Sequence, residues 1–177
     1  YKRQDSYDKH LEYLKRFPYR NLFKEYDAKV ITSEYLIENI EYSFKVWRET
    51  PWGKYVSFDN FCEFILPYRI KDEPLTHWKK DFYHRFKPVL DSLYQGTDVV
   101  EATSCLSNYA TSLHWKYQNE LTGPHLSARL LLELQLGDCT SIADFGCYML
   151  RSVGIPAGID TYLWLSLIHI SEPTRLR

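Results

Sequence analysis

The chain has 177 residues, of which 45% are hydrophobic and 25% are charged, and its formal net charge is −1. This length and composition are typical of one globular domain with a real core. A charge balance so close to zero gives no reason to propose a nucleic acid or an acidic membrane surface as a partner. No apolar run approaches the roughly 20 residues that a membrane-spanning helix needs, so we expect no transmembrane segment.

Helical patterns fill most of the chain up to residue 113. Each begins at a Ser, Thr or Asp that can cap a helix, and its apolar side chains recur at spacings of three and four. The expected helices begin at Asp5 or Ser6, Thr32 or Ser33, Ser57 or Asp59, Thr76, and Asp98. We expect residues 20–30 to be irregular, and Pro88 to kink or split the fourth helix.

The same spacings predict which face of each helix is buried. The expected buried residues of the second to fifth helices are Leu36, Ile40, Phe44 and Trp47; Phe58, Phe61 and Ile65; Trp78, Phe82 and Phe86; and Val99, Thr103, Leu106, Ala110 and Leu113. The opposite side of the fourth helix is basic and is expected to be solvated, with Lys79, Lys80, Arg85 and Lys87.

Three residues between these helices are candidates for substrate binding. Trp52, Tyr68 and Arg69 lie in loops, and loops on a rigid scaffold often carry function. They are expected to border a substrate groove or, alternatively, to pack helix ends together. Further along, residues 114–117 are expected to form a short strand, Gly123-Pro124 a turn, and Ser127 the cap of a short helix.

The stretch from Gly137 to Asp160 organises the chain. Its centre predicts a helix with one apolar stripe, formed by Ile142, Phe145, Gly146, Met149 and Val153. Gly154 is expected to end the helix in the left-handed conformation, and Pro156 prevents its continuation. Alternating apolar and polar residues from Ile159 to Trp164 then predict a strand.

Cys139 stands at the head of this helix, just after Gly137-Asp138. A thiol there meets unpaired backbone amides and the positive end of the helix dipole, which favours the nucleophilic thiolate. The same amides can stabilise an oxyanion formed after attack on an acyl carbon. Because Cys139 precedes Ile142 by three residues, we expect it to share the buried face of the helix, where helix meets sheet. The alternative is a small buried hydrophobe without chemistry.

The pattern Gly137-x-Cys139, then Arg151, then Gly154-Ile155-Pro156-Ala157 resembles the core motif of the transglutaminase-like superfamily, a branch of the papain-like cysteine enzymes. The segment 61–69 is also similar to the N-terminal region of transglutaminase-like proteins from Bacteroidetes-type bacteria. The resemblance implies an α+β fold: a mostly helical part, then a nucleophile helix and the first strand of an antiparallel sheet. It also implies a catalytic His and Asp after Cys139, and an upstream Trp at the oxyanion site, for which Trp115 is the candidate.

The last residues, 165–177, resemble a translated transposase-type adapter of shotgun sequencing libraries. On this interpretation residues 1–164 are a single transglutaminase-like domain fragment of metagenomic type, helical over 1–113 and entering the catalytic core over 114–164. The family His and Asp would then lie beyond Trp164, and we expect the fragment alone to be inactive. His114 and His125 precede Cys139, against the family order of the catalytic base.

The other cysteines and the remaining motifs add no second chemistry. Cys147 is expected to pack in the core, while a Cys62–Cys105 bridge is a minor alternative. No His or Cys pair completes a zinc pattern and no Gly-rich phosphate loop occurs, so we expect neither a metal nor a cofactor.

Three functions are compatible with the sequence. The first is a transglutaminase-like cysteine enzyme that hydrolyses or transfers amide bonds of a peptide, protein or glycopeptide through a Cys139 thioester, with Trp52, Tyr68, Arg69 and Trp164 bordering the substrate. The second is a non-catalytic peptide- or glycan-binding module on the same fold. The third is an intact helical protein with a structural Cys139, which requires residues 165–177 to be genuine. The resemblance slightly favours an extracytoplasmic location.

Overall fold

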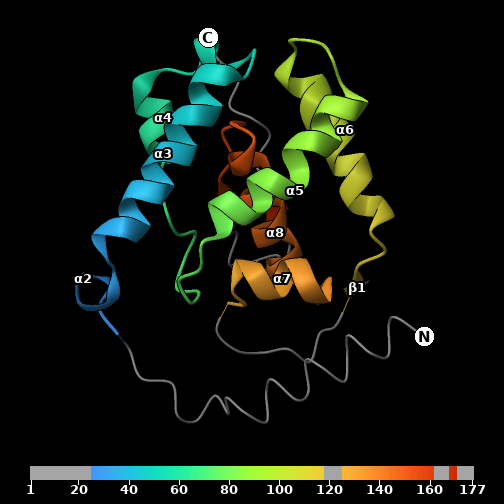
Figure 1. Ribbon diagram of the computed structural model, residues 1–177. Coiled ribbons are helices and arrows are strands. Elements are labelled where there is room, and N and C mark those ends of the chain that lie inside the picture. Colours follow the sequence, from blue (N-terminus) through green and yellow to red (C-terminus); the bar gives the residue numbers. More distant parts are fainter. Residues whose placement is uncertain (1–24, 118–124, 162–167, 171–177) are drawn as a thin grey trace.

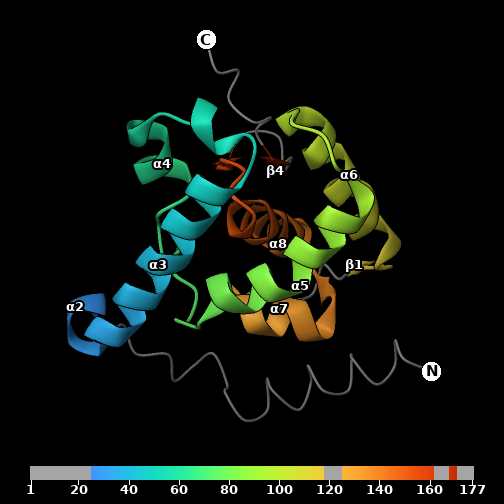
Figure 2. The same cartoon turned by 45° about the horizontal axis from the view of Figure 1, so that its top comes forward.

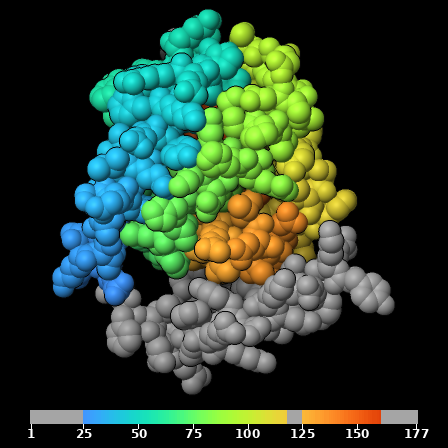
Figure 3. Space-filling view, in the orientation of Figure 1, coloured from blue at the N-terminus to red at the C-terminus, as the bar shows by residue number. Residues whose placement is uncertain are grey.

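A helix that is buried on nearly all sides forms the centre of the fold. The computed structural model describes residues 25–117, 125–161 and 168–170. In it, α8 (Cys139–Ser152) passes through the middle of the other helices (Figures 1 and 2), and every residue from 143 to 153 is buried. In Figure 3 the side chains of the surrounding helices cover α8 almost completely. The expected apolar stripe is buried at Phe145, Met149 and Val153, but the polar face of α8 beyond its first turn is buried as well.

Four helices pack directly on α8. They are α3 (Ser33–Glu49), α5 (Trp78–Leu93), α6 (Val99–Ser112) and α7 (Ala128–Leu134). Shorter helices complete the periphery: α2 (Asp27–Val30), η2 (Gly53–Tyr55) and α4 (Phe58–Phe64). The main core lies between α5 and α8, where Phe82 contacts both Phe145 and Tyr148 at ring-centroid distances of 5.5 Å. A second cluster joins α3 to α4 through Val46, Phe61 and Ile65.

The strands are short and lie at the two ends of α8. β1 (Lys116–Tyr117) pairs in parallel with β2 (Leu136–Gly137), which leads directly into α8. β3 (Ile159–Thr161) follows α8 and pairs antiparallel with β4 (Ile168–Ile170), with Ile159 opposite Ile170. The expected α+β class is confirmed, and the strand that follows α8 belongs to an antiparallel pair.

The capping residues locate most helix starts correctly. Thr32, Ser57, Asp98 and Ser127 each accept a hydrogen bond from a first-turn amide of α3, α4, α6 and α7, respectively. Three expectations are wrong: α2 lies within the segment expected to be irregular, α5 begins at Trp78 after His77 rather than at Thr76, and α5 continues through Pro88 without being split. The expected helix near residues 5–17 and the turn at Gly123-Pro124 lie outside the described residues.

The buried faces differ from the apolar pattern at several positions. Ile40 and Phe58 are 44% and 58% exposed, whereas the residues of α3 that are buried are Asn39, Ser43 and Val46. Lys79, expected on a solvated face, is only 3% exposed. The burial of Ser43 goes with that of Lys79, because the Lys79 ammonium lies between α3 and the 65–67 segment and needs polar neighbours there.

Candidate functional site

The start of α8 is fixed by a side-chain cap. Oδ1 of Asp138 accepts hydrogen bonds from the amide of Ser141 at 2.9 Å and from its hydroxyl at 3.0 Å. A side chain at position 137 would collide with Ser141, so Gly137 is required by this close approach. The cap engages the Ser141 amide, while the amides of Cys139 and Thr140 have no acceptor within the helix. Cys139 is the first helical residue, as the sequence predicts.

The Cys139 thiol lies on the more open side of α8. Its residue is half-buried, and Ile142, one turn further along the same face, is 37% exposed. The expectation that Cys139 shares a buried face with Ile142 is therefore wrong. The partial exposure of Cys139 is compatible with a nucleophilic role, because a substrate must be able to reach a nucleophilic thiol.

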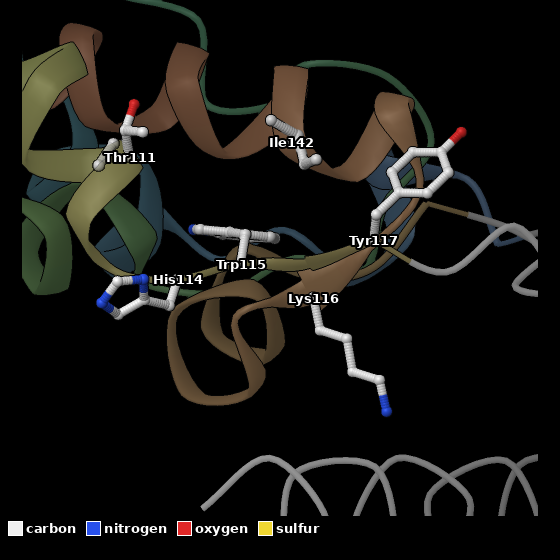
Figure 4. A pocket seen from close by; sticks show the side chains of 7 residues that line it. Thr111, His114, Trp115, Lys116, Tyr117 and Ile142 are labelled. Carbon is white, nitrogen blue, oxygen red and sulfur yellow. The ribbon is translucent and has the colours of Figure 1, made fainter.

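A pocket opens beside this face. It has a volume of about 560 Å³ and is lined by Ala110, Thr111, His114, Trp115, Lys116, Tyr117 and Ile142. Figure 4 shows Trp115 lying between the end of α6 and α8, with Tyr117 next to the start of α8. His114, at φ 55°, adopts the left-handed conformation as the chain leaves α6 for β1. Ile142 connects the pocket to the helix turn that carries Cys139.

Trp115 is placed by contact with the core. Its ring meets the Phe145 ring edge-on at 4.7 Å between centroids. In Figure 4 the indole nitrogen lies at the end of the ring away from Tyr117. Trp115 therefore forms a wall of the pocket beside α8, and its role at an oxyanion site remains a prediction.

The C-terminal half of the sequence motif has a structural role. Gly154 has φ 76°, and a Cβ there would lie 2.9 Å from the Val46 carbonyl oxygen, so the left-handed stop is confirmed. The buried Arg151 donates from Nε to the Ala157 carbonyl at 2.8 Å. Cys147, which is fully buried as expected, donates to the same carbonyl, and burial raises the pKa of its thiol to about 11. These contacts hold the segment that leads from α8 into β3.

A buried group of acids and bases lies elsewhere along α8, and sequence reasoning missed it. Nδ1 of His125 is 2.5 Å from Oδ2 of Asp144, whose side chain is 3% exposed. The hydrogen bond to Asp144 raises the pKa of His125, and burial raises the pKa of Asp144 against the effect of this pair. Among the described residues, Oδ1 of Asp144 has no hydrogen-bond partner.

Glu73 ties the loop before α5 to the same helix. Its Oε1 accepts from the Tyr148 hydroxyl at 2.6 Å and from the Ile70 amide at 2.7 Å, and its Oε2 accepts from the Lys71 amide at 2.8 Å. Burial and the neighbouring Glu73 raise the pKa of Tyr148. A lone acid in a loop carries no sequence signal for burial, so this contact became evident only from the packing.

The candidate substrate-binding residues do not gather at Cys139. Trp52 is 3% exposed and belongs to the main core. Tyr68 and Arg69 both bind Asp27, at 3.0 and 2.7 Å, and so fasten the loop before α5 to α2. These placements correspond to the alternative that the three residues pack elements together. Trp164 lies outside the described residues.

Further features of the described residues bear on ligands and partners. Cys62 and Cys105 are free thiols, so the alternative of a bridge between them is wrong. Within residues 25–117, 125–161 and 168–170, no group of three or more His, Cys, Asp or Glu side chains could hold a metal ion. In the same residues, none of the helices has the length and apolar character to cross a membrane.

The segment of the chain that carries Cys139 matches the model of a known protein family. Residues 91–165 match the family model of the transglutaminase-like superfamily. The match covers α6, β1, α7, β2, α8 and β3, and it confirms the resemblance inferred from the Cys139 motif. Comparisons with curated proteins and with solved structures gave no match.

Proposed function

We propose that the chain is part of a transglutaminase-like cysteine enzyme that acts on amide bonds of a peptide, protein or glycopeptide, with Cys139 as the nucleophile. The observation that carries this proposal is the position of Cys139. Its half-buried thiol begins the central helix within the segment that matches the superfamily, and the same helix face borders an open pocket.

The proposed reaction uses groups at the start of α8. The Cys139 thiolate attacks the amide carbonyl carbon, and the electron pair of the C=O bond moves to oxygen, where helix amides stabilise the charge. When the C–N bond breaks, the amine leaves with a proton and a thioester remains. Water then releases the acid, or a second amine takes the acyl group. Hydrolysis is our preferred outcome by analogy with bacterial relatives of the superfamily.

A general base is needed to take the thiol proton and return it to the leaving amine. In family order this base is a His after Cys139. His125 is engaged with Asp144, so it is already committed to a structural contact. We therefore propose that the catalytic His and Asp come from sequence downstream of residue 164, and that residues 1–164 alone have no turnover.

A non-catalytic binding module on the same fold is the alternative. It is favoured by one observation: the pocket beside α8 is lined by the aromatic side chains of Trp115 and Tyr117. The pocket beside α8 would then bind a peptide or glycan against its aromatic side chains, without bond cleavage.

Alkylation with iodoacetamide, followed by peptide mapping, tests the nucleophile in this chain. We expect Cys139 to react faster at about pH 7 than Cys62 and Cys105, which are equally half-buried and serve as matched controls. Cys147 should react slowest because it is buried. Faster alkylation of Cys62 or Cys105 would overturn the assignment of Cys139.

Activity separates the enzyme from the binding module. A protein made from the uninterrupted gene should cleave a peptide amide or incorporate an amine, and Cys139→Ala should abolish this turnover. Turnover that survives Cys139→Ala would exclude Cys139 as the nucleophile. Binding of peptide without turnover in a protein that contains a downstream His would favour the binding module.

A further inference from the structure

The pairing of β1 with β2 uses only one edge of β1. The Lys116 amide donates to the Gln135 carbonyl at 3.0 Å, so the backbone N–H and C=O groups of Lys116 face β2. Because these groups alternate between the two edges of a strand, those of Trp115 and Tyr117 point to the opposite edge. Among the described residues, no third strand joins this sheet. The edge of β1 that faces away from β2 is therefore open to pairing with another extended chain.

The pocket beside α8 lies along this open edge. The consecutive residues 114–117 all line it, so side chains from both faces of β1 contribute, whereas no residue of β2 is among its described lining. A pocket that receives both faces of one strand must run along the edge of that strand. Its volume of about 560 Å³ is within the range of ligand sites in proteins.

The two sides of the pocket differ in chemistry. In Figure 4, Trp115 and Tyr117 project to the side of β1 along which α8 and Ile142 lie, and Lys116 projects to the other side. The first side is thus aromatic and apolar. His114 and Lys116 supply basic nitrogen atoms, and no Asp or Glu is among the described residues that line the pocket. Charge complementarity therefore favours an occupant that carries acidic groups.

We propose that the pocket binds an extended acidic peptide, which pairs with the open edge of β1 as an added strand. The inference rests on the proposed function, because it names the substrate class of the site beside Cys139. Backbone donors and acceptors that alternate along a strand edge match the backbone of another extended polypeptide, and a glycan has no such backbone. Ile142 lines the pocket one turn after Cys139, so the added strand lies beside the helix turn that carries the thiol.

Strand addition also predicts the pattern of side chains in the peptide. Successive side chains of an added strand lie on opposite faces, each next to the side chains of β1 on that face. Those beside Trp115 and Tyr117 should be apolar, and those beside Lys116 should be acidic. The preferred peptide therefore alternates apolar and acidic residues with a period of two.

The test is the binding of a fluorescein-labelled peptide of alternating Glu and Leu to the whole chain, followed by fluorescence anisotropy. Two forms of this probe carry N-methyl groups, one on its Leu amides and the other on its Glu amides. Only one set can face β1, because amides alternate between the edges of a strand. We expect that set to weaken binding by about three- to tenfold for each hydrogen bond lost, and the other set to have little effect.

The set that responds reports the direction of the added strand. It should be the Leu amides if the peptide runs antiparallel to β1, and the Glu amides if it runs parallel. Equal weakening by both sets, or weakening by neither, would overturn the proposal. A probe with Lys in place of Glu should bind about tenfold more weakly or less, and equal affinity for the two probes would overturn the preference for acidic peptides.

A variant of the chain places the binding site. Ile142→Asp puts a negative charge into the pocket and should weaken binding of the Glu–Leu probe by about tenfold. Ile40→Asp is the matched control, because Ile40 is 44% exposed on α3, Ile142 is 37% exposed, and only Ile142 lines this pocket. Far-ultraviolet circular dichroism checks that both variants keep their helices. Equal affinities of the two variants would overturn the assignment of the peptide to this pocket.

The outcomes also separate this inference from the proposed function. Bound probe should slow alkylation of Cys139 by iodoacetamide and leave that of Cys62 unchanged. If only one N-methylated probe loses affinity but Cys139 reacts no faster than Cys62 or Cys105, the nucleophile assignment fails and the edge of β1 remains a peptide site. If Cys139 is the most reactive thiol but both N-methylated probes bind alike, the nucleophile assignment stands and strand addition is wrong.

Discussion

Arg151 and Ala157 join the two halves of the motif that follows Cys139. Nε of the buried arginine donates to the Ala157 carbonyl at 2.8 Å, across the turn made by Gly154. Arg151 lies twelve positions after Cys139, in the last turn of α8, and it fixes the direction in which the chain departs toward β3. The spacing of the motif is therefore a consequence of helix length and of one buried hydrogen bond.

Replacing this arginine should destabilise the fold. Among the described residues, Arg151→Met leaves the Ala157 carbonyl with only the weak Cys147 thiol as a donor, so we expect a loss of about 2–3 kcal/mol in the free energy of unfolding. Urea titration measures it. Arg129→Met is the control, because the Arg129 side chain is 71% exposed in a surface ion pair and should cost less than about 1 kcal/mol. Equal losses for the two variants would contradict the structural role of Arg151.

The sequence predicted those parts of the site that depend on local chemistry. The caps at Ser127 and Asp138, the left-handed stop at Gly154 and the thiol at the head of α8 all follow from short-range preferences of the backbone. Strand register between β1 and β2 is not a local property. The position of Tyr117 opposite Gly137, beside the start of α8, therefore could not be predicted from spacing.

Burial of charged side chains was the main failure of sequence reasoning. Helical periodicity assigns Lys79 to a polar face because it counts lysine as solvated, whereas α3 offers it the hydroxyl of Ser43. The same rule places an apolar residue such as Ile40 inside, although it is 44% exposed. The packing of α5 against α3 shows that Lys79 and Ser43 form a buried polar contact between the two helices, which we call the polar seam.

The His125–Asp144 pair predicts a dependence of stability on pH. The pKa of His125 is raised in the folded chain, chiefly by Asp144, so the folded state binds the proton more tightly than the unfolded state. Its stabilisation is fully present below the unfolded value of about 6.5 and is lost as the pH rises through the folded pKa. Since the imidazole keeps some contact with water, we expect the contribution to be about 1 kcal/mol.

His125→Gln tests this dependence. The variant should lose more stability relative to the wild type at about pH 6 than at about pH 9, measured by urea titration at both values. His84→Gln is a suitable control, because His84 contacts the hydroxyl of Tyr42 rather than an acid. A difference that is constant over this range, or that grows with pH, would contradict the ion pair.

The adapter resemblance of residues 165–177 gives a prediction at the level of DNA. Re-amplification of the locus from source DNA, with a primer in the Asp138 region, should give a sequence that diverges near codon 165 and then encodes a His. The pairing of β4 with β3 does not oppose this, since apolar residues can pair with an open strand edge by hydrophobicity alone. A natural gene that continues as Ser-Glu-Pro-Thr-Arg at 171–175 would overturn the interpretation.

Lys79 provides a prediction of opposite sign to that of His125. Its ammonium donates to Oγ of Ser43 and to the Ile65 carbonyl, both at 2.6 Å, and no carboxylate is among its described hydrogen-bond partners. Burial lowers the pKa of Lys79 well below its usual value, and the positive charge of Arg151 lowers it further. The folded state therefore binds this proton less tightly than the unfolded state does.

Stability should consequently rise with pH at this site. Between the lowered pKa of folded Lys79 and the unfolded value of about 10.4, the wild type should gain stability relative to Lys79→Met, which cannot titrate. Unfolding of both proteins in urea at several pH values up to about 10 measures the difference. Lys80→Met, in which the lysine removed is exposed and paired with Glu38, is the matched control and should give a nearly constant difference over most of this range. If the Lys79→Met difference is also constant, the buried amine titrates as it does in water, and the polar seam between α3 and α5 must be open to solvent.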